Sequence, residues 1–276
     1  MKYIEHKGIR VPCLGLGTYP MQGRQCYDVV RMALDIGYRH IDTAESYHNE
    51  EPIGEALENS KIPRNEIFLT TKCGFLDASR ENVKKEIESS LVNLRTDYVD
   101  LLLYHWHHKE TPMNETLDAL KEIQSKGLTR NIGVGNFTIP LLKEAKEVHN
   151  IDIFTNQFES HPLLRQIPLE NYCKKNGILV TAHSPIGRGR AVNNEVLQHI
   201  GKKHKKSSVQ VAIRWQLEKE LRMLVPKSTR REGLEENFDV FDFSLDNDDL
   251  KQINEMPNNQ RGSRPDFEPH WDPLDE

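Results

Sequence analysis

Residues 67–105 have the sequence IFLTTKCGFLDASRENVKKEIESSLVNLRTDYVDLLLYH. Ile67–Lys72 and Val99–His105 are short runs rich in apolar and β-branched residues, a composition typical of buried strands. Between the two runs, apolar residues recur every three or four positions, at Val83, Ile87, Leu91 and Leu94. That spacing places one apolar face along a helix. The stretch therefore predicts a strand, a helix and a second strand, which is the order of a parallel β-α-β unit.

The same alternation extends along the chain in both directions. Six further strand-like runs are Leu14–Gly17, Arg39–Asp42, Asn131–Val134, Ile153–Phe158, Ile178–His183 and Met223–Pro226. A second helix-like stretch has apolar residues at Val209, Ala212, Ile213 and Leu217. Eight such units close a (β/α)8 TIM barrel, a fold of about 250 residues, and the chain has 276. No linker, repeat or low-complexity stretch divides the chain, so we expect residues 1–276 to form a single barrel domain.

A doubly wound α/β sheet is the competing fold. It would need about five to seven strands and a GxGxxG phosphate-binding turn after the first of them. Gly15-Leu16-Gly17 begins like that turn, but Tyr19 and Pro20 follow where the pattern requires a helix start. The barrel is therefore the predicted fold.

Local signals mark the ends of several predicted elements. Asn49 precedes an acidic turn that holds a proline, so it is expected to cap a helix. Gly37 and Gly127 lie where preceding helices should stop. Tyr3–Glu5 and Ile9–Val11 flank a short polar turn, which predicts an N-terminal β-hairpin that plugs the bottom of the barrel.

The composition limits the classes of function. Hydrophobic residues make up 37% and charged residues 29% of the chain, and the net charge is −5. This acidic balance argues against a nucleic-acid-binding or membrane-surface protein. The four cysteines show no CxxC spacing, and the N-terminus lacks the apolar run of a signal peptide. We expect a reduced, cytoplasmic enzyme whose acidic tail, His270–Glu276, is solvated.

Four polar residues should meet at one end of the barrel. Active sites of TIM barrels lie at the carboxyl ends of the strands. Asp42, Lys72 and His105 end the second, third and fourth predicted strands, and Tyr47 follows Asp42 in its loop. Taken singly, each has an ordinary structural role as a turn former, packing residue, solvated cation or buried histidine. Their convergence is what predicts an active site.

The chemistry of the four residues is complementary. A tyrosine phenol has a pKa near 10, and a neighbouring ammonium lowers that pKa. Lys72 can act in this way on Tyr47 while Asp42 keeps Lys72 charged, which makes Tyr47 a proton donor. Neutral His105 can hydrogen-bond a substrate carbonyl. This set suits protonation of a carbonyl oxygen while a cofactor supplies hydride to its carbon.

A metal-dependent barrel hydrolase is one alternative. His105 and His107 are two residues apart and would share a face of a strand, and His108 and Asp42 could add ligands. Lys72 would place a cation beside the metal, and no cluster of carboxylates completes the site. We therefore expect no metal site.

The sequence resembles the aldo-keto reductase superfamily over nearly its whole length. The motifs that carry the resemblance are GYRHIDTAESYHNE at residues 37–50, GLTRNIGVGNF at residues 127–137, and PKSTRRE at residues 226–232 followed by Glu235–Phe238. It is most similar to the bacterial 2,5-diketo-D-gluconate reductases of the B type, which also reduce methylglyoxal. The resemblance implies NADPH-dependent reduction of small aldehydes and ketones, with NADH as a possible second cofactor.

The resemblance also implies roles for individual residues. Asp42, Tyr47, Lys72 and His105 match the catalytic tetrad. The cofactor contacts implied are Gly17, Thr18, Asp42, Asn136, Gln157, His183, Ser184, Pro185, Ile186, Gly187, Lys227, Ser228, Thr229, Arg230, Glu236 and Asn237. Among these, Asn136 and Gln157 match the pair that binds the nicotinamide carboxamide, and His183 matches the ring that stacks on the nicotinamide. The substrate contacts implied are Tyr19, Trp106 and His105.

The chain departs from the family pattern at several of these places. Gly135 replaces the serine that usually precedes Asn136, and His183 replaces a larger aromatic ring. Gly233 stands where an arginine near the 2′-phosphate is expected, which weakens the preference for NADPH. Cys73-Gly74-Phe75 replaces a tryptophan of the pocket, and His107 replaces a proline.

These departures are expected to change the substrate pocket. The short segment between Trp106 and Met113 predicts an open mouth and small, polar carbonyl substrates. A non-catalytic NADPH-binding sensor barrel is the second alternative, because some members of the family bind the cofactor as channel subunits. A purely structural barrel is disfavoured by the Lys227–Arg230 run.

Overall fold

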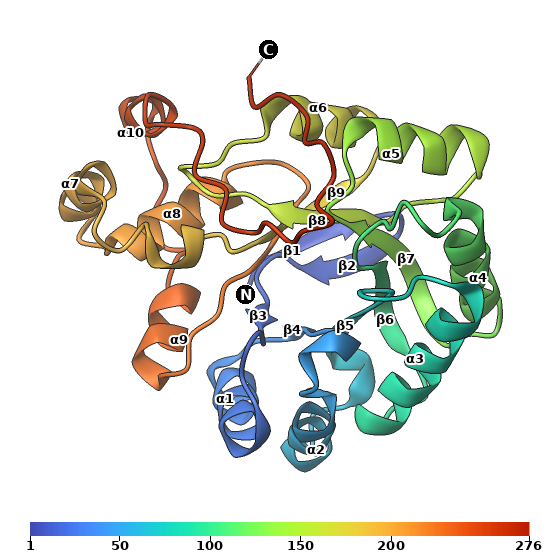
Figure 1. Ribbon diagram of the computed structural model, residues 1–276. Helices are drawn as coiled ribbons and strands as arrows, with labels where there is room; N and C mark the ends of the chain where they lie inside the picture. Colours follow the sequence, from blue (N-terminus) through green and yellow to red (C-terminus); the bar gives the residue numbers. More distant parts are fainter. Residues whose placement is uncertain (276) are drawn as a thin grey trace.

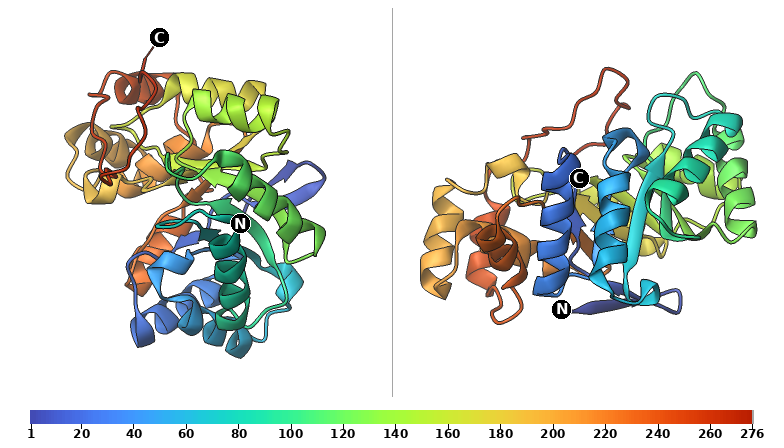
Figure 2. Two further views of the ribbon diagram at one scale, coloured as in Figure 1. Left: turned by 45° about the vertical axis from the view of Figure 1, so that its right-hand side comes forward. Right: turned by 90° about the horizontal axis from the view of Figure 1, so that it is seen from below.

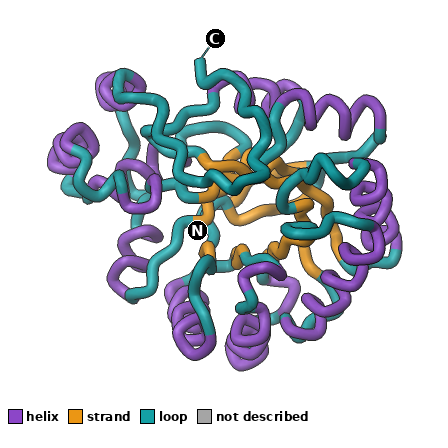
Figure 3. The backbone as a smooth tube through the Cα atoms, in the orientation of Figure 1, coloured by secondary structure: helices purple, strands orange, loops and turns teal. Residues whose placement is uncertain are grey.

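The computed structural model describes residues 1–275. Eight parallel strands form its centre, and they pair with one another in chain order. They are β3 (Leu16–Gly17), β4 (His40–Asp42), β5 (Phe68–Cys73), β6 (Val99–Tyr104), β7 (Thr129–Gly135), β8 (Thr155–Glu159), β9 (Leu179–His183) and β10 (Arg222–Val225). Figures 1 and 3 show these strands enclosed by a ring of helices. The predicted (β/α)8 barrel is confirmed.

The barrel closes between its first and last strands. The backbone N–H of Gly15 donates to the carbonyl of Leu224 at 2.7 Å, and the N–H of Leu224 donates to Cys13 at 2.9 Å. The N–H of Gly17 donates to Pro226 at 3.0 Å. A Cβ on Gly17 would lie 2.6 Å from the carbonyl oxygen of Val225, so only glycine allows this close approach.

The helices alternate with the strands. They are α1 (Gly23–Ile36), α2 (Glu50–Ser60), α3 (Arg80–Asn93), α4 (Met113–Ser125), α5 (Ile139–Lys143), α6 (Ile167–Lys175), α7 (Glu195–His204), α8 (Ser208–Leu217), α9 (Arg231–Phe238) and α10 (Asn247–Asn254). Shorter turns are the 3-10 turns η1 (Glu45–Tyr47), η2 (Arg64–Glu66) and η4 (Gly187–Gly189) and the π turn η3 (Glu144–Val148). In the described residues 1–275, no helix combines the length and apolarity that crossing a membrane requires.

The predicted helix faces and helix ends agree with the structure. Val83 and Ile87 of α3 are buried in the core, as the periodicity required. Gly37 follows α1 with φ 117°, and its backbone N–H donates the capping bonds to the carbonyls of Ala33 and Leu34. Gly127 has φ 75° and lies just after the C-cap of α4. Both glycines adopt the left-handed conformation that ends a helix.

The N-terminal hairpin closes the bottom of the barrel. Strands β1 (Tyr3–His6) and β2 (Ile9–Pro12) pair in antiparallel register. Val11 and its neighbours on the hairpin pack against a cluster inside the barrel that includes Phe68, Phe154 and Met223. Figure 2 shows this hairpin at the end of the barrel opposite the C-terminal segment. The predicted plug is confirmed.

The C-terminal segment crosses the open end of the barrel (Figure 1). The guanidinium carbon of Arg261 lies 3.7 Å from the ring centroid of Trp271. The Trp271 ring also packs edge-on against Trp106, with 6.1 Å between the ring centroids. Asp272 accepts a hydrogen bond from the N–H of Ile139 at 2.9 Å. The prediction of a solvated tail is therefore wrong for Trp271 and Asp272, whose ring and carboxylate anchor the segment, whereas His270, Pro273 and Asp275 are exposed as expected. Glu276 lies outside the described residues.

Asn49 occupies the predicted cap position of α2, but its side chain does not cap the helix. It is fully buried. Its Oδ1 accepts from the hydroxyl of Thr43 at 2.7 Å, and its Nδ2 donates to the carbonyls of Thr18 at 3.3 Å and Met21 at 3.0 Å. The side chain thus joins the loops that follow β3 and β4.

We predict that Asn49→Ala lowers the free energy of unfolding by about 2–4 kcal/mol, because it leaves several buried polar groups unpaired. Asn59→Ala, an exposed substitution on the same helix whose amide contacts only Tyr27, is the matched control. It should change stability by less than about 0.5 kcal/mol. Urea unfolding of both variants measures this, and equal losses would contradict the role given to Asn49.

Candidate active site

The four predicted catalytic residues come together at the carboxyl ends of β4, β5 and β6. Lys72 Nζ forms an ion pair with Asp42 Oδ1 at 2.6 Å and lies 3.4 Å from the hydroxyl of Tyr47. The ring of His105 lies edge-on to that of Tyr47, with 5.7 Å between centroids. Strands β4 and β5 supply Asp42 and Lys72, His105 directly follows β6, and the turn η1 supplies Tyr47.

The Lys72–Asp42 pair is almost completely withdrawn from solvent. Lys72 is 2% exposed and Asp42 is 3% exposed. Burial lowers the pKa of the Lys72 ammonium, but attraction by Asp42 and Tyr47 outweighs burial, so the pKa lies above its ordinary value. Lys72 also donates to the carbonyl of Thr43 at 2.7 Å. Lys72 is therefore a cation held in place by Asp42 and Thr43, with its ammonium beside the Tyr47 hydroxyl.

Tyr47 remains a protonated phenol at neutral pH. Burial raises its pKa, and this effect exceeds the lowering caused by Lys72. The predicted influence of Lys72 has the right sign, but the expected net decrease in the pKa of Tyr47 is wrong. The reason is that the pocket that surrounds the phenol disfavours its anion more than one ammonium favours it.

His105 is a neutral imidazole. Burial lowers its pKa well below 6.5, and the nearby Lys72 and His183 lower it further. Its Nδ1 lies 3.5 Å from the hydroxyl of Ser46. A neutral ring can donate one hydrogen bond to a substrate carbonyl without adding a second positive charge beside Lys72.

A cavity of about 830 Å³ opens above these residues. It collects most of the residues expected to bind cofactor or substrate, namely Gly17, Thr18, Tyr19, Asp42, Tyr47, His105, Trp106, Asn136, Gln157, His183, Ser184, Pro185, Ile186 and Lys227. Lys72 lies beneath its floor, held against Asp42. A cavity of this size falls in the range of small-molecule sites.

The remaining predicted cofactor residues lie outside the lining of the cavity. They are Gly187, Ser228, Thr229, Arg230, Glu236 and Asn237. Arg230 is the N-cap of α9, so Ser228–Arg230 approach the amino end of that helix. The amino end of a helix attracts phosphate, which is compatible with an extended ligand that continues from Lys227 along the surface.

Two departures from the family pattern have a steric basis. A Cβ on Gly135 would lie 2.5 Å from the carbonyl oxygen of His105, so a serine there requires a wider separation of β6 and β7. A Cβ on Gly233 would lie 2.3 Å from the hydroxyl of Ser228. Any larger residue at position 233 must therefore displace the Ser228 side chain.

Phe75 takes the place of the expected pocket tryptophan. Its ring lies 5.0 Å from that of His105 and 5.7 Å from Phe267 of the C-terminal segment. Gly262–Pro265 of the same segment also line the cavity. The mouth is therefore narrower and more aromatic than the short Trp106–Met113 segment predicted.

No sequence pattern indicates that Glu159 anchors the C-terminal segment. It is 1% exposed, and its carboxylate accepts hydrogen bonds from the N–H groups of Gly262 at 2.9 Å and Ser263 at 2.8 Å. Burial raises its pKa, but the bond from His161, the charge of His183 and the backbone N–H of Ser263 outweigh this effect and lower it to about 2. A lone glutamate at a strand end carries no sequence signal that it anchors a segment about 100 residues away.

Two of the three histidines of the metal-site alternative, His107 and His108, are directed away from Asp42 and His105. The ring of His107 packs against Tyr104 and Phe137. His108 Nε2 lies 2.7 Å from the carbonyl oxygen of Phe75. Within residues 1–275, no group of three His, Cys, Asp or Glu side chains is arranged to hold a metal ion.

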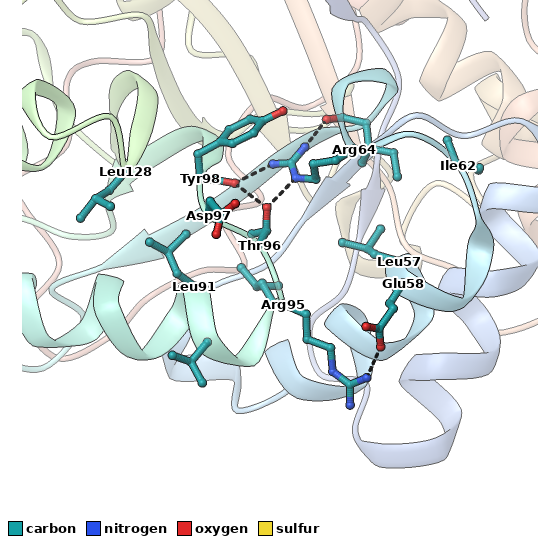
Figure 4. A pocket seen from close by; sticks show the side chains of 13 residues that line it. Leu57, Glu58, Ile62, Arg64, Leu91, Arg95, Thr96, Asp97, Tyr98 and Leu128 are labelled. Carbon is teal, nitrogen blue, oxygen red and sulfur yellow. Dashed lines mark hydrogen bonds and ion pairs between the residues drawn. The ribbon is translucent and has the colours of Figure 1, made fainter.

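A second hollow of about 820 Å³ lies between the carboxyl ends of α2 and α3 (Figure 4). Its wall contains Arg64, whose guanidinium donates to Thr96, Ile67, Asp100 and Tyr98. None of the predicted catalytic or cofactor residues lines it. Arg64 is occupied by the loops it connects, and Arg95 forms an ion pair with Glu58, so neither guanidinium of this hollow is free to bind a ligand.

The residues present fit a nicotinamide dinucleotide. Arg188 and Lys227 line the cavity, and neither forms an ion pair within residues 1–275, so both charges are available to phosphate groups. Gln157 uses one amide N–H to bind Asp42 Oδ2 at 2.7 Å, which leaves its amide oxygen for a ligand. The side-chain amide of Gln157 suits the nicotinamide carboxamide, and the cations Arg188 and Lys227 suit the phosphate groups of such a cofactor.

Several known proteins are similar to this chain in sequence or in structure. A 9,11-endoperoxide prostaglandin H2 reductase of Trypanosoma cruzi (strain CL Brener) is 39% identical over 266 residues, which are 95% of this chain and 93% of that protein. A methylglyoxal reductase of Escherichia coli O157:H7 is 38% identical and covers 95% and 99%. A crystal structure provisionally assigned as a 2,5-diketo-D-gluconic acid reductase B is 35% identical, with a TM-score of 0.95 over 99% and 98% of the two chains.

The family model described as the aldo/keto reductase family matches residues 13–258. This range contains the whole barrel, the tetrad and the amides that face the cavity. Members of this family are oxidoreductases that use nicotinamide cofactors. The chain therefore belongs to the aldo-keto reductase family.

Proposed function

We propose that this protein is an NADPH-dependent reductase of small aldehydes and ketones such as methylglyoxal and 2,5-diketo-D-gluconate. The observation that supports this most directly is the contact between the Tyr47 hydroxyl and Lys72, which is itself paired with Asp42, at the base of a cavity beside His105. We further propose that residues 1–276 act as a single domain and that the enzyme is a cytoplasmic monomer.

The proposed reaction divides the work between protein and cofactor. A reduced nicotinamide bound in the cavity would supply the hydride for the carbonyl carbon. Tyr47 donates its phenolic proton to the carbonyl oxygen, and Lys72 stabilises the phenolate that this leaves. His105 donates a hydrogen bond to the same oxygen and sets the angle of approach. Asp42 keeps Lys72 charged and in place.

The residues that would hold the cofactor lie partly in the cavity and partly on the surface beyond Lys227. Asn136 and Gln157 would bind the carboxamide, and His183 would stack on the nicotinamide ring. Gly17, Thr18 and the Ser184–Gly187 loop would hold the adjoining part of the cofactor, with the loop at the pyrophosphate. Lys227–Arg230 would bind the 2′-phosphate, and Glu236 and Asn237 would contact the adenine. The preference for NADPH rests on Lys227 and Arg230, because Gly233 provides no charge.

Small carbonyls are the proposed substrates for two reasons. Tyr19, Phe75, Trp106 and the Gly262–Pro265 segment border the cavity beside His105, where their side chains would enclose a small substrate. The names of two relatives, methylglyoxal reductase and glyoxal reductase, describe small dicarbonyls. These observations support a compact dicarbonyl substrate.

We expect Tyr47→Phe to lower kcat for methylglyoxal reduction by about 10²- to 10⁴-fold, the usual contribution of a general acid. The dissociation constant of NADPH should stay within about twofold, because the phenol contacts the substrate. Tyr172→Phe, on helix α6, is the matched control and should keep wild-type turnover. Unchanged kcat in Tyr47→Phe would eliminate Tyr47 as the acid. Loss of cofactor binding with kcat unmeasurable would indicate damage to the site.

The pH profile should be flat across the neutral range. Tyr47 donates its proton only below its pKa, which lies above 10, so activity should fall only as the pH rises beyond that value. His105 is neutral above its pKa, which lies well below 6.5, so the acid limb should also lie below that value. Measurement of kcat/KM from pH 6 to pH 10 tests this. A basic limb near pH 8 would contradict the raised pKa of Tyr47.

Lys227→Gln should weaken NADPH binding by about tenfold, as expected for loss of a hydrogen bond to a charged group. NADH lacks the 2′-phosphate, so its affinity should change by less than about twofold. Fluorescence titration with each cofactor measures both effects. Lys175→Gln, an exposed lysine on α6, serves as the control for lost charge. Equal weakening of both cofactors would contradict the phosphate assignment.

A further inference from the structure

His183 makes a contact that its expected stacking role does not require. Its Nε2 lies 3.2 Å from Oδ1 of Asn136, and its Nδ1 lies 3.3 Å from the hydroxyl of Ser184. Asn136 in turn donates from Nδ2 to the carbonyl oxygen of His105 at 3.3 Å. A chain of hydrogen bonds thus connects the ends of β9, β7 and β6 at the mouth of the barrel.

The carbonyl of His105 determines which way the Asn136 amide faces. A backbone carbonyl only accepts hydrogen bonds, so the amide nitrogen must point toward it. The reversed amide would place Oδ1 against the carbonyl oxygen and would leave two acceptors in repulsive contact. Because Nδ2 faces His105, Oδ1 faces His183.

The amide orientation determines the tautomer of His183. Oδ1 of Asn136 accepts only, so Nε2 of His183 must carry the hydrogen. Burial lowers the pKa of His183 to about 4, although Glu159 opposes this effect. The ring is therefore neutral at physiological pH, and its bare Nδ1 accepts from the hydroxyl of Ser184.

We propose that His183 is a positioning residue that locks the Asn136 amide in one orientation, through an Nε2–H bond, and so presents one N–H and one lone pair of Asn136 to the nicotinamide carboxamide. This role rests on the proposed function. It differs from ring stacking, because a phenyl ring of similar size stacks but cannot donate the bond.

The backbone at Gly135 and Asn136 explains why the Asn136 amide has to be held in one orientation. Asn136 has φ 60°, a left-handed conformation that directs its side chain toward the mouth. Gly135 has no hydroxyl to bind the carboxamide, and a side chain there would meet the carbonyl oxygen of His105. The side chain of Asn136 is therefore the only side-chain amide of this turn available to the cofactor. Asn136 is 5% exposed, so little solvent can orient its amide.

The tautomer is tested directly by NMR on the wild-type protein with ¹⁵N-labelled histidine. Long-range proton–nitrogen spectra distinguish an Nε2–H ring from an Nδ1–H ring, and the signal that disappears in His183→Phe identifies residue 183 among the 12 histidines. We expect the Nε2–H form at pH 7. The Nδ1–H form would overturn the proposal, whether or not the protein proves to be a reductase.

A double-mutant cycle on cofactor affinity tests the lock itself. His183→Phe should raise the dissociation constant of NADPH about fivefold, the usual effect of one hydrogen bond. In an Asn136→Gly background the same substitution should change it by less than about twofold, because the bond no longer exists. Glycine is chosen because it accepts the positive φ at position 136.

The outcomes separate the lock from stacking and from the proposed function. If the two substitutions changed the dissociation constant of NADPH independently, their effects would multiply in the double variant. That result would overturn the proposal, since it would mean that His183 acts without Asn136. An unchanged dissociation constant in His183→Phe would also overturn it. If the wild-type protein bound neither NADPH nor NADH, the proposed function would fail, and the NMR result would still decide the orientation of the amide.

Discussion

The buried Lys72–Asp42 ion pair is the interaction on which the rest of the site depends. Withdrawal of two charges from water costs several kcal/mol per ion, and only good geometry with further hydrogen bonds offsets this cost. Here the offset comes from Thr43, which accepts from Lys72, and from Gln157, which donates to Asp42 across the barrel. Such a pair requires strands β4, β5 and β8 to be fixed relative to one another, so closure of the barrel is a condition for its existence.

The fold and the tetrad were predictable from the sequence because both rest on short-range patterns. The periodicity of Val83 and Ile87 indicates a buried helix face, and parallel strands necessarily place Asp42 and Lys72 at the same end. The path of the C-terminal segment was not predictable. It depends on Glu159 binding backbone N–H groups about 100 residues away, and backbone groups leave no trace in the pattern of side chains.

Asn49 shows a second limit of local signals. Its position before an acidic turn indicates a helix cap, and the helix does begin there. Its side chain nevertheless bonds Thr43 and two loop carbonyls, because the tertiary contacts satisfy groups that would otherwise be buried and unpaired. A cap motif therefore predicts where a helix begins better than it predicts what the side chain binds.

The balance of forces at Tyr47 explains why the acid needs Lys72 although its pKa stays high. Burial keeps the phenol protonated, so the proton is present at every pH near neutrality. Burial also makes the phenolate costly to form, and this is the moment at which charge develops. Lys72 is already positioned 3.4 Å from the oxygen, so its attraction strengthens as the negative charge appears. The ammonium therefore contributes more to proton release than to the resting ionisation of Tyr47, and Asp42 is required because a buried lysine without a partner would itself lose its proton.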